Sequence, residues 1–128
     1  MIYVDTSVVL AYLLAEDRTP PDSFWEKELI SSRLIEYEVW NRLHSRRLEA
    51  THGEAARALL NRIAFLELAP PVLVRALEPF PVPVRTLDAL HLASLHFLSE
   101  RDPSVVLATY DERMAAAARK LKFRVTTP

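Results

Sequence analysis

The chain opens with Met1-Ile2-Tyr3-Val4-Asp5-Thr6-Ser7, and this stretch decides how the rest of the sequence is interpreted. An apolar, β-prone run ends abruptly in an aspartate that is followed by two hydroxyl residues. We expect a buried strand that places the Asp5 carboxylate at its carboxyl end, which is where open α/β sheets bind ligands. A simpler interpretation is that Asp5 only caps the helix predicted from about Ser7 to Ala15, because aspartate is a common N-cap residue.

The composition predicts an ordinary globular chain. Of 128 residues, 50% are hydrophobic and 26% are charged, so we expect one soluble domain over residues 1–128. The absence of cysteine excludes disulfides, thiolate zinc sites and cysteine nucleophiles. No secretory signal is recognised, and the longest apolar run, Ala89 to Leu98, is too short to cross a bilayer, so a cytoplasmic protein is expected. The net charge of −1 does not favour nucleic-acid binding, although carboxylates gathered around a metal ion would leave the other surface net positive.

Strands and helices are expected to alternate along the chain. This order predicts an α/β fold with a mostly parallel sheet and helices on both faces. The segment from Phe80 to Val84 carries prolines among apolar residues, so it can form only an edge or irregular strand. The other predicted strands are the initial run and residues Glu28–Ser31, Val105–Thr109 and Phe123–Thr126.

The helices are predicted from capping residues and from apolar spacing. Thr51 and Glu54 form a capping box, and the helix they begin should continue through Ile63 to Leu66, because apolar residues recur there at helical spacing. Thr86 is expected to cap the helix Leu87–Ser99. The remaining predicted helices run from Ser31 or Ser32 to about Leu48, from Pro71 to Glu78 and from Asp111 to about Leu121.

Four carboxylates are expected near one edge of this sheet. Asp5 and Asp111 each follow an apolar strand, Asp88 lies in the first turn of a helix, and Glu38 lies in the second turn of another. Such crowding is repulsive, and the usual reason for it is a hard divalent cation that takes oxygen ligands. Each residue also has an ordinary explanation: helix capping for Asp111, the helix dipole for Asp88, and an i,i+4 ion pair with Arg42 for Glu38.

Four segments of the chain resemble the conserved blocks of PIN-domain ribonucleases, and most closely those of the VapC toxins of toxin–antitoxin pairs. The resemblance covers essentially the whole chain, in order. It implies a three-layer α/β/α sandwich with a central, mostly parallel sheet, an acidic Mg²⁺ or Mn²⁺ site, and cleavage of single-stranded or loop RNA. The segments are Val4-Asp5-Thr6-Ser7, Ser32-x-Leu34-x3-Glu38-x4-Leu43, Arg85-Thr86-Leu87-Asp88-Ala89-Leu90-His91-Leu92-Ala93 and Thr109-Tyr110-Asp111-x-Arg113-Met114.

The resemblance also assigns roles to residues and partners to the chain. Its four acids would be both catalytic residues and metal ligands: Asp5, Glu38, Asp88 and Asp111. A small antitoxin and a homodimer are implied, and the apolar helix Val8–Leu14 and the region of Trp25 are expected to be incompletely covered in a monomer. The hydroxyls behind the acids or facing the phosphate would be Thr6, Ser7 and Thr109. Apart from the resemblance, the basic residues that are candidate phosphate contacts are Arg85, Arg113 and the group Arg42, Arg46 and Arg47, and a solvated surface role is the alternative for each.

Two residue assignments have competing interpretations, and for the first of them we choose Glu38. Glu36 and Glu38 are both candidates for the second acidic position. Only Glu38 has a serine six positions before it and a leucine five positions after it, as the resembled block does. His91 follows Asp88 at i+3 and could approach the site, although such a histidine, like His96, is more often structural. Lys122 stands where the resembled family commonly has glycine, which would cost stability if the backbone there is left-handed.

Three alternative functions are weighed against a toxin nuclease. A housekeeping PIN nuclease would have the same acids but no antitoxin. A non-catalytic PIN-like module that binds RNA or protein would have lost acids, whereas all four are present. An α/β phosphotransferase would need an Asp-x-Asp motif or a glycine-rich loop, but position 7 is serine and Gly53 is the only glycine.

Overall fold

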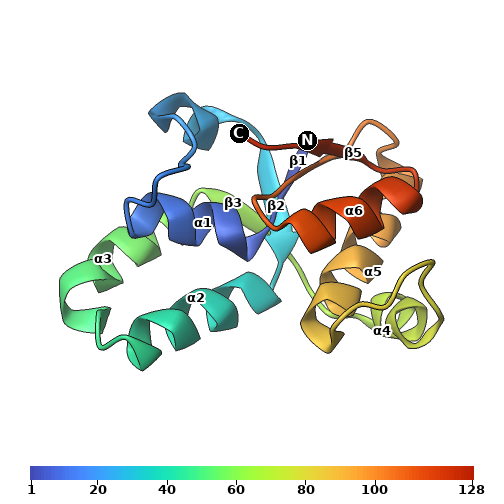
Figure 1. Cartoon of the computed structure of the whole chain (residues 1–128), viewed down its shortest axis with the longest axis horizontal. Helices are drawn as coiled ribbons and strands as arrows, with labels where there is room; N and C mark the ends of the chain where they lie inside the picture. Colours follow the sequence, from blue (N-terminus) through green and yellow to red (C-terminus); the bar gives the residue numbers. More distant parts are fainter.

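A five-stranded, wholly parallel sheet forms the centre of the molecule in the computed structural model, which describes residues 1–128 (Figure 1). The strand order is β3-β2-β1-β4-β5, so the N-terminal strand lies in the middle. Every neighbouring pair runs parallel, which confirms the predicted α/β class. The strands are β1 (Ile2–Val4), β2 (Leu29–Ser32), β3 (Ile63–Leu66), β4 (Val106–Ala108) and β5 (Arg124–Thr126).

Helices cover both faces of this sheet, as the sandwich requires. The first three helices gather on one side of the sheet and the last three on the other (Figure 1). No helix is both long enough and apolar enough to cross a membrane. The helices are α1 (Thr6–Leu13), α2 (Leu34–Ser45), α3 (Glu49–Leu60), α4 (Pro70–Leu77), α5 (Thr86–Arg101) and α6 (Glu112–Lys120), with a short 3₁₀ helix at Asp22–Glu26.

The sheet separates two hydrophobic cores because successive side chains of a strand point to opposite faces. On β1, Val4 joins the core under α1, α2 and α3, whereas Tyr3 joins the core under α5 and α6. Val8 to Ala11 and Trp25 are buried in the first core, so the expectation of incomplete cover is wrong for them, whereas Tyr12, Leu13 and Leu14 at the end of the helix are only partly buried. The large apolar side chains that do lie exposed are Tyr37, Leu73, Val74, Leu77 and Leu87.

The third strand is not where the sequence placed it. The helix predicted through Leu66 ends at Leu60, and Ile63–Leu66 forms β3, which pairs with β2 from Leu29 to Ser32. Pairing with an existing strand therefore overrides the helical spacing of Ile63 and Leu66. Phe80–Val84 forms no strand, because its prolines lack the N–H groups that a ladder needs; its apolar side chains pack on the second core instead.

Helix ends also differ from the predictions. The helix α3 begins at Glu49, and the Thr51 hydroxyl donates to the Leu48 carbonyl, so the predicted capping box is wrong. Thr86 is the first residue of α5 rather than its cap, a position that Arg85 holds. Lys122 has a φ of 70°, so this non-glycine residue does occupy a left-handed position between α6 and β5.

Candidate active site

The carboxyl ends of β1 and β4 bring two of the acids together. Val4 pairs with Ala108 at the ends of these neighbouring strands, and the chain continues from them directly toward Asp5 and Asp111. Glu38 reaches the same region from the second turn of α2, and Asp88 from the first turn of α5. Four elements that are distant in sequence therefore deliver one acid each.

Three of these acids line an open cleft of about 550 Å³, which we call the acidic cleft. Asp5 is not part of its lining and is 7% exposed, yet its charge contributes to the raised pKa of Asp88, so it lies close behind the cleft. The structure thus gathers all four predicted acids in one region. The lining residues are Glu38, Arg42, Arg85, Thr86, Leu87, Asp88, Asp111 and Arg113.

Two hydroxyls fix the Asp5 carboxylate. Its Oδ2 accepts hydrogen bonds from Ser7 Oγ at 2.6 Å and from Thr109 Oγ1 at 2.8 Å. Ser7 Oγ also accepts a hydrogen bond from the backbone N–H of Tyr110 at 3.0 Å, and Thr109 Oγ1 accepts one from the backbone N–H of Asp111 at 2.9 Å. Because each hydroxyl bonds both Asp5 and the β4–α6 loop, the loop that carries Asp111 is tied to the end of β1. Ser7 and Thr109 therefore lie beside Asp5 and hold its carboxylate.

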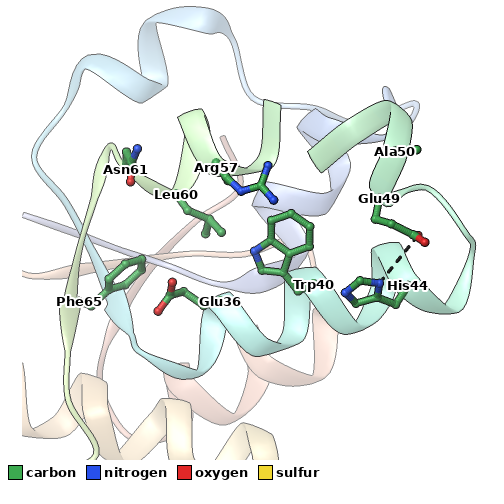
Figure 2. Close-up of a pocket in the computed structure, with 9 residues that line it drawn as sticks. All are labelled: Glu36, Trp40, His44, Glu49, Ala50, Arg57, Leu60, Asn61 and Phe65. Carbon is green, nitrogen blue, oxygen red and sulfur yellow. Dashed lines mark ion pairs between the residues drawn. The ribbon is translucent and has the colours of Figure 1, made fainter. Parts of the chain in front are cut away.

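Glu38 and Glu36 point to different places. Glu38 Oε1 accepts a hydrogen bond from Thr6 Oγ1 at 2.9 Å and lies 2.5 Å from His91 Nε2. Glu36 instead pairs with Arg33 at 2.7 Å and lines a separate hollow between α2 and α3, shown in Figure 2. The structure places Glu38 in the acidic cleft and Glu36 outside it. The alternative ion pair of Glu38 with Arg42 does not form.

The hollow in Figure 2 is roomier than the acidic cleft, at about 650 Å³, but its chemistry is different. Its centre is Trp40, over which the Arg57 guanidinium lies 4.8 Å from the ring centroid. At its edge His44 and Glu49 form an ion pair at 3.8 Å (Figure 2). It contains none of the four gathered acids, so we do not regard it as the catalytic site.

The electrostatics of the acidic cleft show that its charges act on one another. Burial raises the pKa of the Asp88 carboxyl, and the negative charges of Asp111, Asp5 and Glu38 raise it further, while His91 opposes them. Asp111 uses Oδ1 to accept the backbone N–H groups of Arg113 at 2.9 Å and Met114 at 3.1 Å. Asp111 therefore does cap α6. The cap engages only one of the two carboxylate oxygens.

His91 is buried beneath the cleft rather than on its surface. Its ring is 2% exposed, with Nδ1 2.7 Å from the Tyr3 hydroxyl and Nε2 on Glu38. Burial disfavours the charged imidazolium, but the carboxylates of Glu38, Asp5 and Asp88 outweigh burial and raise the pKa of His91. Tyr3 was not predicted as part of the site, because it precedes His91 by 88 residues and no local pattern connects them. His96 lies on the surface and pairs with Glu100 at 3.1 Å.

Three arginines at the rim of the cleft have no acidic partner. No carboxylate lies within 4.0 Å of the guanidinium groups of Arg42, Arg85 or Arg113, although all three line the acidic cleft. Arg46 and Arg47, which follow α2, do not line the cleft. The region therefore combines buried or half-buried negative charge with exposed cationic groups that remain available to an anion.

The donor set suits a hard divalent cation. Carboxylate oxygens are the ligands that Mg²⁺ and Mn²⁺ prefer, and a cation would relieve the repulsion that raises the pKa of Asp88. No three histidine, aspartate or glutamate side chains lie close enough together to form a ready-made cage. Mg²⁺ commonly retains several waters and is held by only one or two carboxylates, so an open cleft of this type is compatible with it.

Comparisons with known proteins agree with this geometry. The model of the PIN domain family matches residues 2–120. Ribonuclease VapC47 of Mycobacterium tuberculosis is 30% identical over 135 residues, which cover 100% of this chain and 97% of that protein. Ribonuclease VapC35 of the same species is 30% identical over 136 residues, with the same coverage of both chains. The chain thus belongs to the PIN domain family.

Proposed function

We propose that this chain is a metal-dependent endoribonuclease that cleaves single-stranded or loop RNA, and that it acts as the toxin of a toxin–antitoxin pair. The observation that carries the proposal is the acidic cleft, where Glu38, Asp88 and Asp111 lie together with Asp5 behind them. The similarity to proteins named ribonuclease VapC supports the RNA substrate and the toxin role.

In this proposal the four acids together hold one or two Mg²⁺ or Mn²⁺ ions, which keep part of their bound water. Such an ion, when bound, activates water and stabilises the charge of the scissile phosphate. The chain's own contribution is to place the acids: Ser7 and Thr109 hold Asp5, and Thr6 holds Glu38. No serine, cysteine or histidine nucleophile is needed for this reaction.

The rim arginines would bind the RNA backbone. Arg42, Arg85 and Arg113 line the cleft without acidic partners, and guanidinium groups bind phosphate oxygens well. Phosphate contacts fix where the strand lies but do not read its sequence. We therefore expect binding that weakens as salt concentration rises.

The partners in this proposal are a small antitoxin and a second copy of the chain. The resemblance to the VapC toxins of toxin–antitoxin pairs, together with the similarity to proteins named ribonuclease VapC, supports an antitoxin. For a homodimer, the support is an exposed apolar group on α4, formed by Leu73, Val74 and Leu77. Light scattering at micromolar concentration tests the dimer, because a monomer there contradicts it. Pull-down with the product of the adjacent reading frame tests the antitoxin and separates a toxin from a housekeeping nuclease.

The central experiment measures RNA cleavage by the purified protein. We expect cleavage of a single-stranded RNA with Mg²⁺ or Mn²⁺, and loss of cleavage with EDTA that added metal restores. Asp88→Asn should abolish the activity. Undiminished cleavage by the chelated protein would contradict metal dependence, and a fully active Asp88→Asn protein would show that the acidic cleft is not the active site.

A further inference from the structure

A continuous chain of hydrogen bonds runs through the second core and ends on Glu38. The backbone N–H of Ser32 donates to the Tyr3 hydroxyl at 3.2 Å, and that hydroxyl lies 2.7 Å from His91 Nδ1. His91 Nε2 lies 2.5 Å from Glu38 Oε1. Tyr3 and His91 are 1% and 2% exposed, whereas the side chain of Glu38 is 21% exposed and opens to the acidic cleft. The chain therefore leads from the buried interior to one acid of the site.

The direction of the chain is set where it meets Glu38, because a carboxylate oxygen can only accept a hydrogen bond. His91 Nε2 therefore carries a proton and donates it to Glu38 Oε1, whether the imidazole is neutral or charged. In the neutral imidazole, Nδ1 accepts from the Tyr3 hydroxyl, whose oxygen accepts from the backbone N–H of Ser32; in the imidazolium, Nδ1 donates to the same oxygen. In both states His91 donates to the carboxylate of Glu38 and is held at its other ring nitrogen by Tyr3.

The two carboxylate oxygens of Glu38 consequently differ. Oε1 accepts hydrogen bonds from His91 Nε2 and from Thr6 Oγ1, which belong to two different helices. No hydrogen bond of the protein reaches Oε2. Oε1 is therefore occupied by hydrogen bonds within the protein, and Oε2 is left for a ligand in the cleft.

We propose that Tyr3 and His91 are positioning residues, which act through Glu38 by holding its carboxylate so that Oε2 is presented to a divalent cation. This inference rests on the proposed function, because it assumes that Glu38 binds the ion. Groups that orient metal ligands in this way commonly change metal affinity or activity about 10- to 100-fold when they are removed.

The surroundings argue that the chain does more than fill space. The neighbouring side chains Leu92, Leu95 and Leu107 are apolar and fully buried, and the buried hydroxyls of Ser31 and Ser94 already donate to backbone carbonyls. Burying a phenol and an imidazole among them is costly unless their polar atoms are satisfied. Apolar residues of similar size would pack there without any need for hydrogen-bond partners. Tyr3 and His91 instead form a chain of hydrogen bonds that ends at Glu38.

The test compares variants that change the polarity of the chain but little of its shape. His91→Leu removes both hydrogen bonds, whereas His91→Gln keeps an amide oxygen for the Tyr3 hydroxyl and an amide N–H for Glu38. Tyr3→Phe removes a single oxygen. Tyr12→Phe is the matched control, because it removes a tyrosine hydroxyl that bonds Asp22 at 2.7 Å outside the acidic cleft. Circular dichroism and thermal melting establish that each variant is folded.

The primary readout is Mn²⁺ affinity, measured by calorimetry without RNA. We expect His91→Leu to bind Mn²⁺ about 10- to 100-fold more weakly, Tyr3→Phe to lose affinity in the same direction, and both His91→Gln and Tyr12→Phe to stay near wild type. In a Glu38→Gln background, His91→Leu should cause no further loss, because residues that act through one another are not additive. At saturating Mn²⁺, His91→Leu should lower kcat for RNA cleavage and leave KM nearly unchanged.

Each contrary result has a definite meaning. Wild-type affinity in folded His91→Leu overturns the inference, as does equal loss in His91→Gln and His91→Leu, since polarity would then not matter. If His91→Leu does not fold, wild-type affinity in Tyr3→Phe overturns it. Failure of the wild-type protein itself to bind Mn²⁺ rejects the proposed metal site, and the inference falls with it; normal binding with insensitive variants rejects the inference alone.

Discussion

Asp88→Asn should stabilise the metal-free protein while abolishing its activity. The substitution keeps the size and shape of the side chain and removes one negative charge from a region that also holds Asp5, Glu38 and Asp111. Burial and these three carboxylates raise the pKa of Asp88. Because a raised pKa means that the folded protein binds the proton more tightly, ionisation of Asp88 costs native stability.

The pH dependence of this effect has a definite sign. Below the pKa that Asp88 has in the unfolded chain, about 3.9, the carboxyl is protonated in both states and the charge repulsion contributes nothing. As the pH rises from there through the raised folded pKa, the destabilisation develops, and it is complete above that value. The advantage of Asp88→Asn should therefore be present at pH 7.5 and decrease toward pH 4.

The magnitude is modest because Asp88 is only half-buried and water screens its charge. Repulsion from three neighbours is partly offset by the favourable position of a negative charge in the first turn of α5, which is worth about 0.3–1 kcal/mol. We expect a net gain of about 1 kcal/mol in the free energy of unfolding, or roughly 3–5 °C in Tm for a domain of this size. Magnesium should reverse the order, since a ligand at 100 times its Kd adds about 2.7 kcal/mol to the wild type.

The assay is thermal unfolding of both proteins at pH 7.5 and pH 4, with EDTA and with excess Mg²⁺. Asp88→Ala is a useful second variant, because it removes the charge without supplying a polar side chain to the helix terminus. If Asp88→Asn melts below wild type in EDTA at pH 7.5, the residue is chiefly a helix-end residue and the argument from repulsion is refuted. If Mg²⁺ moves neither melting temperature, the shared metal site is refuted as well.

Three further outcomes are expected. Glu38→Gln should lose RNA cleavage whereas Glu36→Gln retains most of it, because Glu36 faces Arg33 outside the acidic cleft. The cleavage rates of the two variants test this, and a greater loss in Glu36→Gln would contradict the assignment of Glu38. Arg113→Ala should raise KM for RNA more at low than at high salt, and a salt-independent effect would argue against a phosphate contact. Lys122→Gly should stabilise the fold by about 1 kcal/mol in urea unfolding, because Lys122 has a φ of 70°; unchanged stability would show that the strain is absorbed.

Local sequence patterns were sufficient to predict the position of a residue where the end of one strand or helix determines it. The β1 run ends at Asp5, and the strand before Thr109 likewise leads to Asp111, so the common edge of a parallel sheet follows from the sequence. The segment Ile63–Leu66 could not be assigned in this way, because four apolar residues fit either a helix or a buried strand until β2 pairs with them. The contact of Tyr3 with His91 was also beyond local patterns, since it depends on how α5 packs on β1.

The ordinary and the functional explanations of the acids prove to be compatible. Asp111 does cap α6, but through Oδ1 alone. Asp5 stands at the N-cap position of α1, while its carboxylate bonds the hydroxyls of Ser7 and Thr109 instead of the backbone N–H groups of the helix. A residue at the start of a helix that follows a parallel strand is already at the ligand-binding edge of the sheet. Capping positions therefore supply acids to the cleft at little structural cost. What separates a cap from a site residue is the convergence of several such positions, which here includes Glu38 from α2, a residue that caps nothing.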